Sequence, residues 1–311
     1  MHQPGFEADI LREPAALDTL LDHYGAPGGP LADLQLADAR RIVLLGMGSS
    51  QFAARTAAAL WRSRGIDAHV ELASAAHPFP PSADTVAIGI SASGGSAETV
   101  EALERHHGTS RTIALTNYPD RAIAGHADVV LPMLAGAEEG GIACRSFQAT
   151  LALLHLIAGV SPDELRPAVA AAQAIVDTRD TWLGDLLEVV GDGPVYTIAP
   201  YERISSALQS ALMFREAPRI AADGCETGDW LHVDLYLTKH PGYRALLFTG
   251  SRYDPEVLTW ARERACAIVA VGRTIEGAAL HIAVPDDPLV AVLVETMVAE
   301  LAASELWRRR L

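Results

Sequence analysis

The sequence predicts an α/β protein with two tandem five-stranded parallel sheets. Short apolar runs with the length of buried strands alternate with longer segments of helical spacing. Strands that alternate with helices indicate a parallel sheet covered by helices on both faces. The elements of the first half also recur, in the same order, in the second half. We therefore expect two copies of one α/β unit in the 311-residue chain.

The first half begins with a helical segment that leads into the alternating series. Residues 6–24 carry apolar side chains mostly at helical spacing, interrupted by Pro14, and residues 25–30 (GAPGGP) are predicted to form a loop. We expect strands at residues 41–45, 68–72, 85–90, 111–116 and 129–133. We expect helices at residues 51–64, 97–106 and about 142–158.

The second half follows a boundary at residues 161–163 (SPD) and a turn cluster at residues 191–194 (GDGP). We expect strands at residues 195–198, 244–248, 267–271 and 280–284, a short apolar piece near Ile220, and helices at 202–214, 255–264 and 289–307. The predicted organisation is an N-terminal helical segment at residues 1–30, a first domain at 31–160, a linking helix at 161–190 and a second domain at 191–311.

Residues 91–99 (SASGGSAET) join a buried strand to a helix and are the strongest candidate for a binding site. Free N–H groups at a helix N-terminus favour an anion, serine hydroxyls add donors, and glycines let the backbone approach a ligand. We interpret this stretch as a phosphate-binding loop; the alternative is that Ser93 or Ser96 simply caps the helix. Gly48, Ser50 and Asn117 also follow strand ends, where open α/β sheets bind their ligands.

The corresponding loop of the second half, residues 249–254 (TGSRYD), lacks this serine and glycine composition. We therefore expect one phosphate site per chain, in the first domain.

Composition narrows the class of protein. The formal net charge of −15 argues against nucleic-acid partners, which need basic surface. No apolar run reaches transmembrane length, and the first four residues show no signal-peptide pattern, so we expect a cytoplasmic protein without a membrane partner. Three scattered cysteines fit reduced thiols and no zinc site, and we expect neither a metal nor an organic cofactor.

Several motifs together resemble the double sugar isomerase (SIS) family, in particular the isomerase half of glucosamine-6-phosphate synthase and the stand-alone amino-sugar-phosphate deaminases and deglycases. The match runs from about Phe6 to Trp307. The motifs that carry it are residues 46–50 (GMGSS), 91–99, 135–138 (AGAE), 143–147 (ACRSF), 207–216 (ALQSALMFRE) and 228–232 (GDWLH).

The resemblance implies a fold of two SIS domains of flavodoxin-like type and a homodimer with shared active sites. It places the sugar-phosphate ligands at Gly48, Ser50, Ser91, Ser93, Gly94 and Ser96. Glu216 holds the position of the family's glutamate, which shuttles a proton between C1 and C2. His232 holds the position of the histidine that opens the sugar ring and typically comes from the neighbouring subunit. A carboxylate suits the carbon proton transfer, and histidine suits proton exchange near neutral pH.

The sequence also departs from the family. Ala92 replaces a glutamine of the serine loop, Met213 and Arg215 replace lysines, and Arg145 follows Cys144 where relatives carry Thr-Lys. The only lysine is Lys239, and the chain ends at Leu311 without the family's lysine-bearing loop. Because no glutaminase domain precedes the repeats, we expect no glutamine-dependent synthesis.

We expect a phosphosugar isomerase-type enzyme that transfers a proton between C1 and C2 of a sugar or amino-sugar 6-phosphate. One alternative is an amino-sugar-phosphate deaminase or fructosamine-phosphate deglycase, since these reactions start with the same proton transfer. Another is a non-catalytic phosphosugar sensor. A dinucleotide-dependent oxidoreductase is a weaker alternative, because Gln51 stands where the third glycine of that fingerprint belongs.

Overall fold

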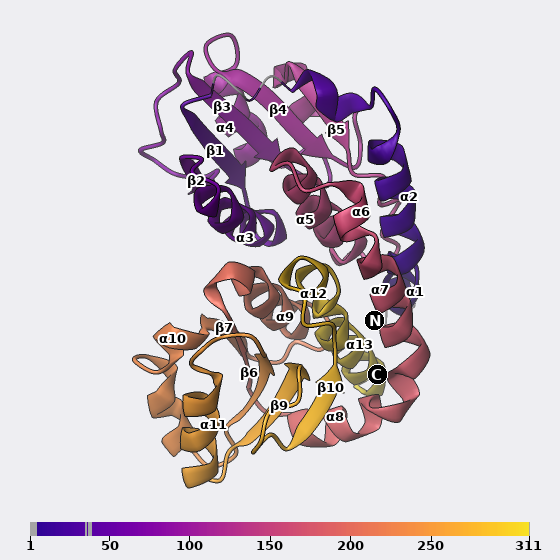
Figure 1. Cartoon of the computed structure of the whole chain (residues 1–311), viewed down its shortest axis with the longest axis vertical. Helices are drawn as coiled ribbons and strands as arrows, with labels where there is room; N and C mark the ends of the chain where they lie inside the picture. The colour runs from indigo at the N-terminus through magenta and orange to yellow at the C-terminus, as the bar shows by residue number, and fades with distance from the viewer. Residues whose placement is uncertain (1–4, 35, 37–38, 311) are drawn as a thin grey trace. The chain divides into compact units, whose positions relative to one another are not determined.

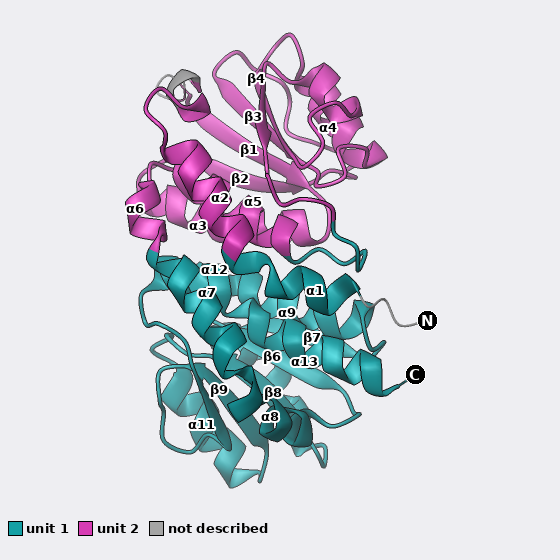
Figure 2. Ribbon diagram, turned by 90° about the vertical axis from the view of Figure 1, so that its right-hand side faces the viewer, with its two compact units in different colours: residues 1–14, 138–144, 167–311 teal, residues 15–137, 145–166 magenta. Residues whose placement is uncertain are grey.

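The computed structural model describes residues 5–34, 36 and 39–310, which fall into two compact units (Figure 2). Unit 1 comprises residues 1–14, 138–144 and 167–311, and unit 2 comprises residues 15–137 and 145–166. Residues 1–4, on which the signal-peptide prediction rests, lie outside the described residues, as do 35, 37, 38 and 311.

Unit 2 contains a five-stranded parallel sheet with the order β2-β1-β3-β4-β5 (Figure 1). Its strands are β1 (Arg41–Gly46), β2 (Ala68–Leu72), β3 (Thr85–Ile90), β4 (Arg111–Thr116) and β5 (Val129–Pro132). Every residue of β3 is buried, as its apolar sequence predicts for a central strand. The order reverses between β1 and β3, and Gly46 at the end of β1 aligns with Ile90 at the end of β3.

Helices cover the sheet of unit 2. They are α2 (Glu13–Gly25, whose first two residues belong to unit 1), α3 (Ser49–Ser63), α4 (Ala97–His106), α5 (Arg145–Ile157) and α6 (Pro162–Leu165), with short 3₁₀ helices η1 (Pro30–Asp33) and η2 (Ala122–His126). Leu103 of α4 and Ile123 of η2 pack on the face of the sheet that carries Val43 and Leu45. Helices α3 and α5 pack on each other, and the Trp61 indole donates to a backbone carbonyl of α5.

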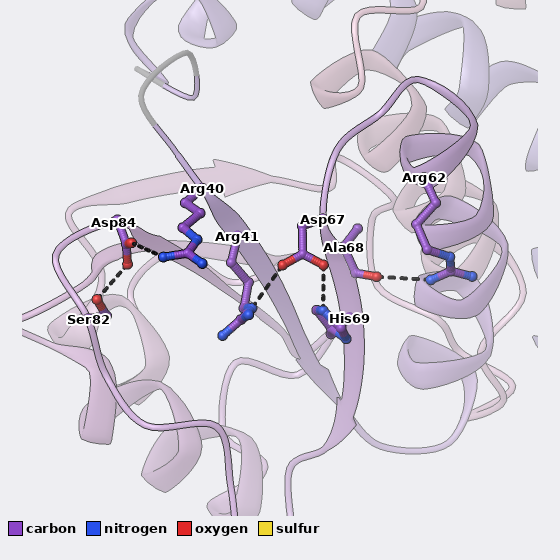
Figure 3. A network of polar contacts seen from close by, with 8 residues as sticks. All are labelled: Arg40, Arg41, Arg62, Asp67, Ala68, His69, Ser82 and Asp84. Carbon is purple, nitrogen blue, oxygen red and sulfur yellow. Dashed lines mark hydrogen bonds and ion pairs between the residues drawn. The ribbon is translucent and has the colours of Figure 1, made fainter.

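A polar network lies where the strands of this sheet begin, opposite to their carboxyl ends (Figure 3). Asp67 accepts hydrogen bonds from Arg41 Nε at 3.1 Å and from His69 Nε2 at 2.7 Å. The His69 hydrogen bond is the main cause that lowers the pKa of Asp67. Ser82 donates to Asp84, whose carboxylate also lies 4.0 Å from Arg40. These contacts join the starts of β1 and β2 and the turn before β3.

Unit 1 contains a second parallel sheet with the order β10-β9-β8-β6-β7. Its strands are β6 (Val195–Ala199), β7 (Ala222–Glu226), β8 (Arg244–Phe248), β9 (Ala267–Gly272) and β10 (Leu280–Ala283). Counted from its own first strand, this sheet has the same strand order as the sheet of unit 2. The predicted fold class, two five-stranded parallel sheets with flanking helices, is therefore confirmed.

The helices of unit 1 are α1 (Gly5–Leu11), α7 (Pro167–Thr178), α8 (Leu183–Val190), α9 (Ile204–Glu216), α10 (Thr227–Trp230), α11 (Asp254–Glu263), α12 (Pro288–Val294) and α13 (Thr296–Arg309), with 3₁₀ helices η3 (Arg179–Thr181), η4 (Tyr201–Arg203) and η5 (Asp234–Lys239). The predicted linking helix is thus several helices. One new helix begins at Pro167, because proline suits a helix start and interrupts a helix interior. The predicted terminal helix is α12 and α13, which meet at Glu295 with nearly helical backbone angles (φ −67°, ψ −25°).

A pair of carboxyl groups is buried where the N-terminal segment of unit 1 meets α13. Glu13 and Glu300 are almost fully inaccessible, and their carboxyl groups lie close enough to affect each other's protonation. Burial is the main cause that raises the pKa of Glu300 to about 7; the Glu13 side chain opposes this rise and the carboxylate of Glu138 adds to it. Asp9 lies on the same segment and accepts a hydrogen bond from the backbone N–H of Gly140 at 2.7 Å.

This pair predicts a loss of stability as pH rises. The folded protein holds a proton on Glu300 between pH 4.5 and about 7 that the unfolded chain releases, so the free energy of unfolding falls across that window. The loss should reach up to about 3 kcal/mol above pH 7. Glu300→Gln should flatten the profile, measured by urea unfolding from pH 4.5 to 8. The surface variant Glu256→Gln should leave it unchanged; equal profiles for both variants would contradict the assignment.

Candidate functional site

The serine loop after β3 is held in a single backbone shape by its own hydrogen bonds. Ser91 is buried, and its hydroxyl accepts the N–H of Ser96 at 3.5 Å, while Ser93 accepts the N–H of Gly95 at 3.3 Å. Gly94 has a positive φ of 68°, and a Cβ there would come within 2.7 Å of the Arg121 Cβ. Only glycine fits this position, so the Gly in the motif has a steric reason.

The N-terminus of α4 carries an internal carboxylate. Ser96 is the N-cap residue but makes no side-chain cap hydrogen bond; instead its hydroxyl donates to Glu98 at 3.0 Å. The hydrogen bonds from the Glu98 backbone N–H and from Ser96 lower the pKa of Glu98. The structure therefore does not show the alternative, in which a serine side chain simply caps the helix. The Ser96 hydroxyl and the backbone N–H of Glu98 at this helix end instead bind the Glu98 carboxylate, which is an anion.

The loop after β1 reaches the same edge of the sheet. Gly48 has a φ of 50° and precedes α3, whose first residues are Ser49 and Ser50. Since β1 and β3 are neighbours and end in register, Gly48 and Ser50 leave the sheet beside Ser91. This is the point where the strand order reverses, the usual ligand position in such sheets. The structure thus brings the predicted phosphate ligands to one edge.

Asn117 and Arg145 hold the backbone of the neighbouring loop at residues 135–137, and their side chains are used in these hydrogen bonds. Asn117 follows β4, donates to the carbonyl of Gly136 at 2.6 Å and accepts the N–H of Ala135 at 3.0 Å. Arg145 is buried and donates to the carbonyls of Ala135 and Ala137 at 2.6 and 2.5 Å. The sequence did not predict this role, because the contact joins the start of α5 to a loop ten residues earlier.

Glu216 is the last residue of α9, in unit 1, and lies on a cavity of about 620 Å³. Glu216 is an exposed residue, yet the protein atoms around its carboxylate partly desolvate it and raise its pKa, and Arg215 partly opposes that shift. Arg219, with a positive φ of 59°, donates from Nε to the Glu216 carbonyl at 3.2 Å. The cavity is lined by Gly140, Gly141, Ile142, Arg215, Glu216, Arg219 and Trp307.

His232 follows the short helix α10 and has an exposed side chain. Its backbone N–H donates to the Asp229 carbonyl at 2.8 Å, and α10 is capped by the Glu226 carboxylate. His232 does not line the cavity of Glu216. The predicted site is thus divided: Glu216 and His232 belong to unit 1, and the serine loop belongs to unit 2.

The described residues, 5–34, 36 and 39–310, contain no group of three or more His, Cys, Asp or Glu side chains that could hold a metal ion. None of their helices has the length and apolar character needed to cross a membrane.

Comparison with known sequences places part of this chain in a described family. The SIS domain family matches residues 35–159. The glutamine–fructose-6-phosphate aminotransferase (isomerizing) of Gloeobacter violaceus is 28% identical over 263 residues, which cover 74% of this chain and 42% of that protein. The corresponding protein of Aeropyrum pernix is 28% identical over 250 residues, covering 72% and 39%. The chain thus spans about two fifths of the length of these relatives.

Solved structures share the fold of the whole chain. The C-terminal domain of glucosamine-fructose-6-phosphate aminotransferase from Francisella tularensis has a TM-score of 0.85 at 17% identity, covering 98% of this chain and 95% of that one. Tagatose-6-phosphate ketose/aldose isomerase from Escherichia coli has a TM-score of 0.86 at 20% identity, covering 98% and 93%. Glucosamine-6-phosphate deaminase from Thermotoga maritima has a TM-score of 0.78 at 18% identity, covering 98% and 95%. These likenesses concern the fold.

Proposed function

Starting from a chain that carries an SIS domain at residues 35–159 and is homologous to the isomerase part of glutamine–fructose-6-phosphate aminotransferases, we propose that this protein is a phosphosugar isomerase-type enzyme. It transfers a proton between C1 and C2 of a sugar or amino-sugar 6-phosphate. The observation that carries the proposal is Glu216, a carboxylate of raised pKa that lies on a cavity at the end of a helix.

The chemistry follows from the residue types. Moving a carbonyl between C1 and C2 needs one base that removes a proton from one carbon and returns it to the next. A partly desolvated carboxylate such as Glu216 is a stronger base than one in water, because burial disfavours its charged form. In this proposal the serine loop holds the phosphate, which takes over the Ser96 hydroxyl and the α4 amide that Glu98 now occupies.

The experiment is incubation in deuterated water with a panel of hexose and hexosamine 6-phosphates. Deuterium at C1 or C2 would reveal the proton transfer even where net turnover is slow. A parallel ammonia assay distinguishes deamination or deglycation from isomerisation. A sensor would bind the sugar phosphates without exchange.

We also propose a homodimer in which His232 completes the active site of the partner subunit. What supports this is the surface around His232: Val233, Tyr236 and Leu237 are 53%, 64% and 38% exposed, an apolar surface beside an exposed histidine. Such surface favours burial in an interface.

Mixing two inactive variants tests the shared site. Glu216→Gln and His232→Ala should each lose exchange activity. After subunit exchange, a mixed dimer has one intact site, with the glutamate from one subunit and the histidine from the other. Equal mixing should therefore restore about a quarter of wild-type activity by random pairing. No recovery, with subunit exchange verified by light scattering of tagged chains, would contradict the shared site.

A further inference from the structure

A second cavity, of about 670 Å³, lies at the carboxyl ends of the strands of unit 1. We name it the unit 1 crevice; its walls come from the segments that follow all five strands of the sheet. In the order β7-β6-β8-β9-β10 the direction reverses between β6 and β8, and Arg203 and Thr249, which follow these strands, both line it. Crevices at such reversals bind ligands in open α/β sheets, and this volume suits a small molecule.

The floor of the unit 1 crevice is rigid. Arg203 is only 6% exposed and donates to the buried carboxylate of Glu295 and to the carbonyl of Thr249. The backbone of the loop after β8 lies directly on this guanidinium: a Cβ at Gly250 would come within 2.6 Å of Arg203 Nη2. Gly272 packs equally closely on the Thr249 hydroxyl. Because these side chains are already fixed, a ligand that binds on them costs little conformational entropy.

The loop after β8 already holds an anion of its own. The buried carboxylate of Asp254 accepts the N–H of Gly250 at 2.7 Å. That amide is therefore not available to a phosphate. The sequence led us to expect one phosphate site per chain, in the first domain, and a second site in unit 1 departs from that expectation. A ligand anion in the crevice must be held by side chains instead.

The charged side chains of the crevice are separated along the sheet. Glu226 ends β7 and Glu202 follows β6, whereas Arg252 follows β8 and Arg273 follows β9. Neighbouring strands are about 4.8 Å apart, so Glu202 and Arg252, which follow adjacent strands, start about 5 Å apart. Glu226 and Arg273 lie three strands apart and start about 14 Å apart. Asp286, after β10, forms the rim beyond Arg273.

Arg252 and Arg273 are exposed, and each guanidinium group is held by a neighbouring side chain. Arg252 Nη2 donates to the Tyr253 hydroxyl at 2.5 Å and its guanidinium stacks 4.7 Å from that ring. Arg273 Nη2 lies 3.9 Å from the Asp254 carboxylate. Guanidinium groups bind phosphate oxygens with paired hydrogen bonds, and carboxylates bind ammonium groups and hydroxyls.

We propose that the unit 1 crevice binds a sugar phosphate that carries a protonated amine. The phosphate lies on Arg252 and Arg273, and the amine faces Glu226 and Glu202. The ring of Tyr253 offers an apolar face to the sugar. This site is distinct from the serine loop, and its ligand class is inferred from the carboxylates on the β7 and β6 side and the arginines on the β8 and β9 side.

Calorimetric titration of the full chain with glucosamine 6-phosphate tests the proposal. Wild-type protein should bind a second molecule per chain. The double variant Arg252→Ala/Arg273→Ala should weaken one of the two sites about tenfold or more, because each lost hydrogen bond is to a charged group. Ser93→Ala/Ser96→Ala should weaken only the other. Arg262→Ala, an exposed arginine of α11 outside the crevice, is the matched control and should change neither.

Glucose 6-phosphate, which lacks the amine, should lose about tenfold in affinity at the site that the arginine variant removes. The proposal is overturned if the arginine variant binds like wild type, if the serine variant abolishes all binding, or if glucose 6-phosphate binds the crevice equally well. Arginine-dependent binding without deuterium exchange in any sugar phosphate would overturn the proposed function and leave the crevice intact.

Discussion

Glu216→Gln is expected to lower proton exchange between C1 and C2 of a bound sugar phosphate by about 10³-fold, within the range typical of a lost general base. Affinity for the sugar phosphate should stay within about threefold, because the amide keeps the size of the carboxylate and the phosphate is held elsewhere. The reason is the environment of Glu216: burial raises its pKa, and a glutamine at the same place cannot accept the proton. Deuterium incorporation measures the rate and calorimetry the affinity.

The chain offers a matched control for this variant. Glu263 is also the last residue of a helix in unit 1 and is an exposed residue like Glu216, but it does not line the Glu216 cavity. Glu263→Gln should leave both exchange and affinity unchanged. If Glu216→Gln keeps its exchange rate, or loses exchange and affinity together, Glu216 is not the base.

Arg203→Met is expected to reduce the free energy of unfolding by about 3–5 kcal/mol, the usual cost of leaving a buried ion without its partner. Arg203 and Glu295 are 6% and 0% exposed and form a buried ion pair under the unit 1 crevice. Without Arg203, the Glu295 carboxylate would be buried without the cation that now partly offsets the rise in its pKa. Urea denaturation measures the loss, which should be smaller at pH 5 than at pH 8, since Glu295 can then take up a proton.

The double variant Arg203→Met/Glu295→Leu distinguishes the contribution of the ion pair to stability from that of side-chain packing. Replacing both ions by apolar side chains removes the uncompensated charge, so the double variant should recover most of the stability lost in the single one. A double variant as unstable as Arg203→Met, with no difference between pH 5 and pH 8, would show that shape rather than charge is what Arg203 supplies.

The alternation of apolar runs and helical segments predicted the two sheets because each buried parallel strand requires a continuous apolar stretch. Strand β7, at Ala222–Glu226, was not itself predicted: the sequence showed only a short apolar piece near Ile220. Its sequence, ADGCE, has no apolar run, since β7 is an edge strand and packs through its backbone. A Cβ at Gly224 would come within 2.8 Å of the Ala207 backbone, which explains a glycine there.

Local patterns predicted the serine loop, because its residues are consecutive and follow a buried strand. Interactions that depend on the fold were not predictable in the same way. The buried Arg145 and the arrangement of charged residues in the crevice each combine residues from different elements, so their contacts depend on the tertiary structure. The presence of a single lysine, Lys239, was visible in the sequence, whereas the position of Arg215 and Arg219 on the same cavity as Glu216 depends on the fold.

Wild-type protein in deuterated water with fructose 6-phosphate, glucose 6-phosphate and glucosamine 6-phosphate provides the most direct measurement. A carboxylate that shuttles a proton along a sugar held by its phosphate must place solvent deuterium at C1 or C2 of at least one of these compounds. Tight binding of all three with no deuterium in any of them would mean that the protein recognises sugar phosphates without acting on them.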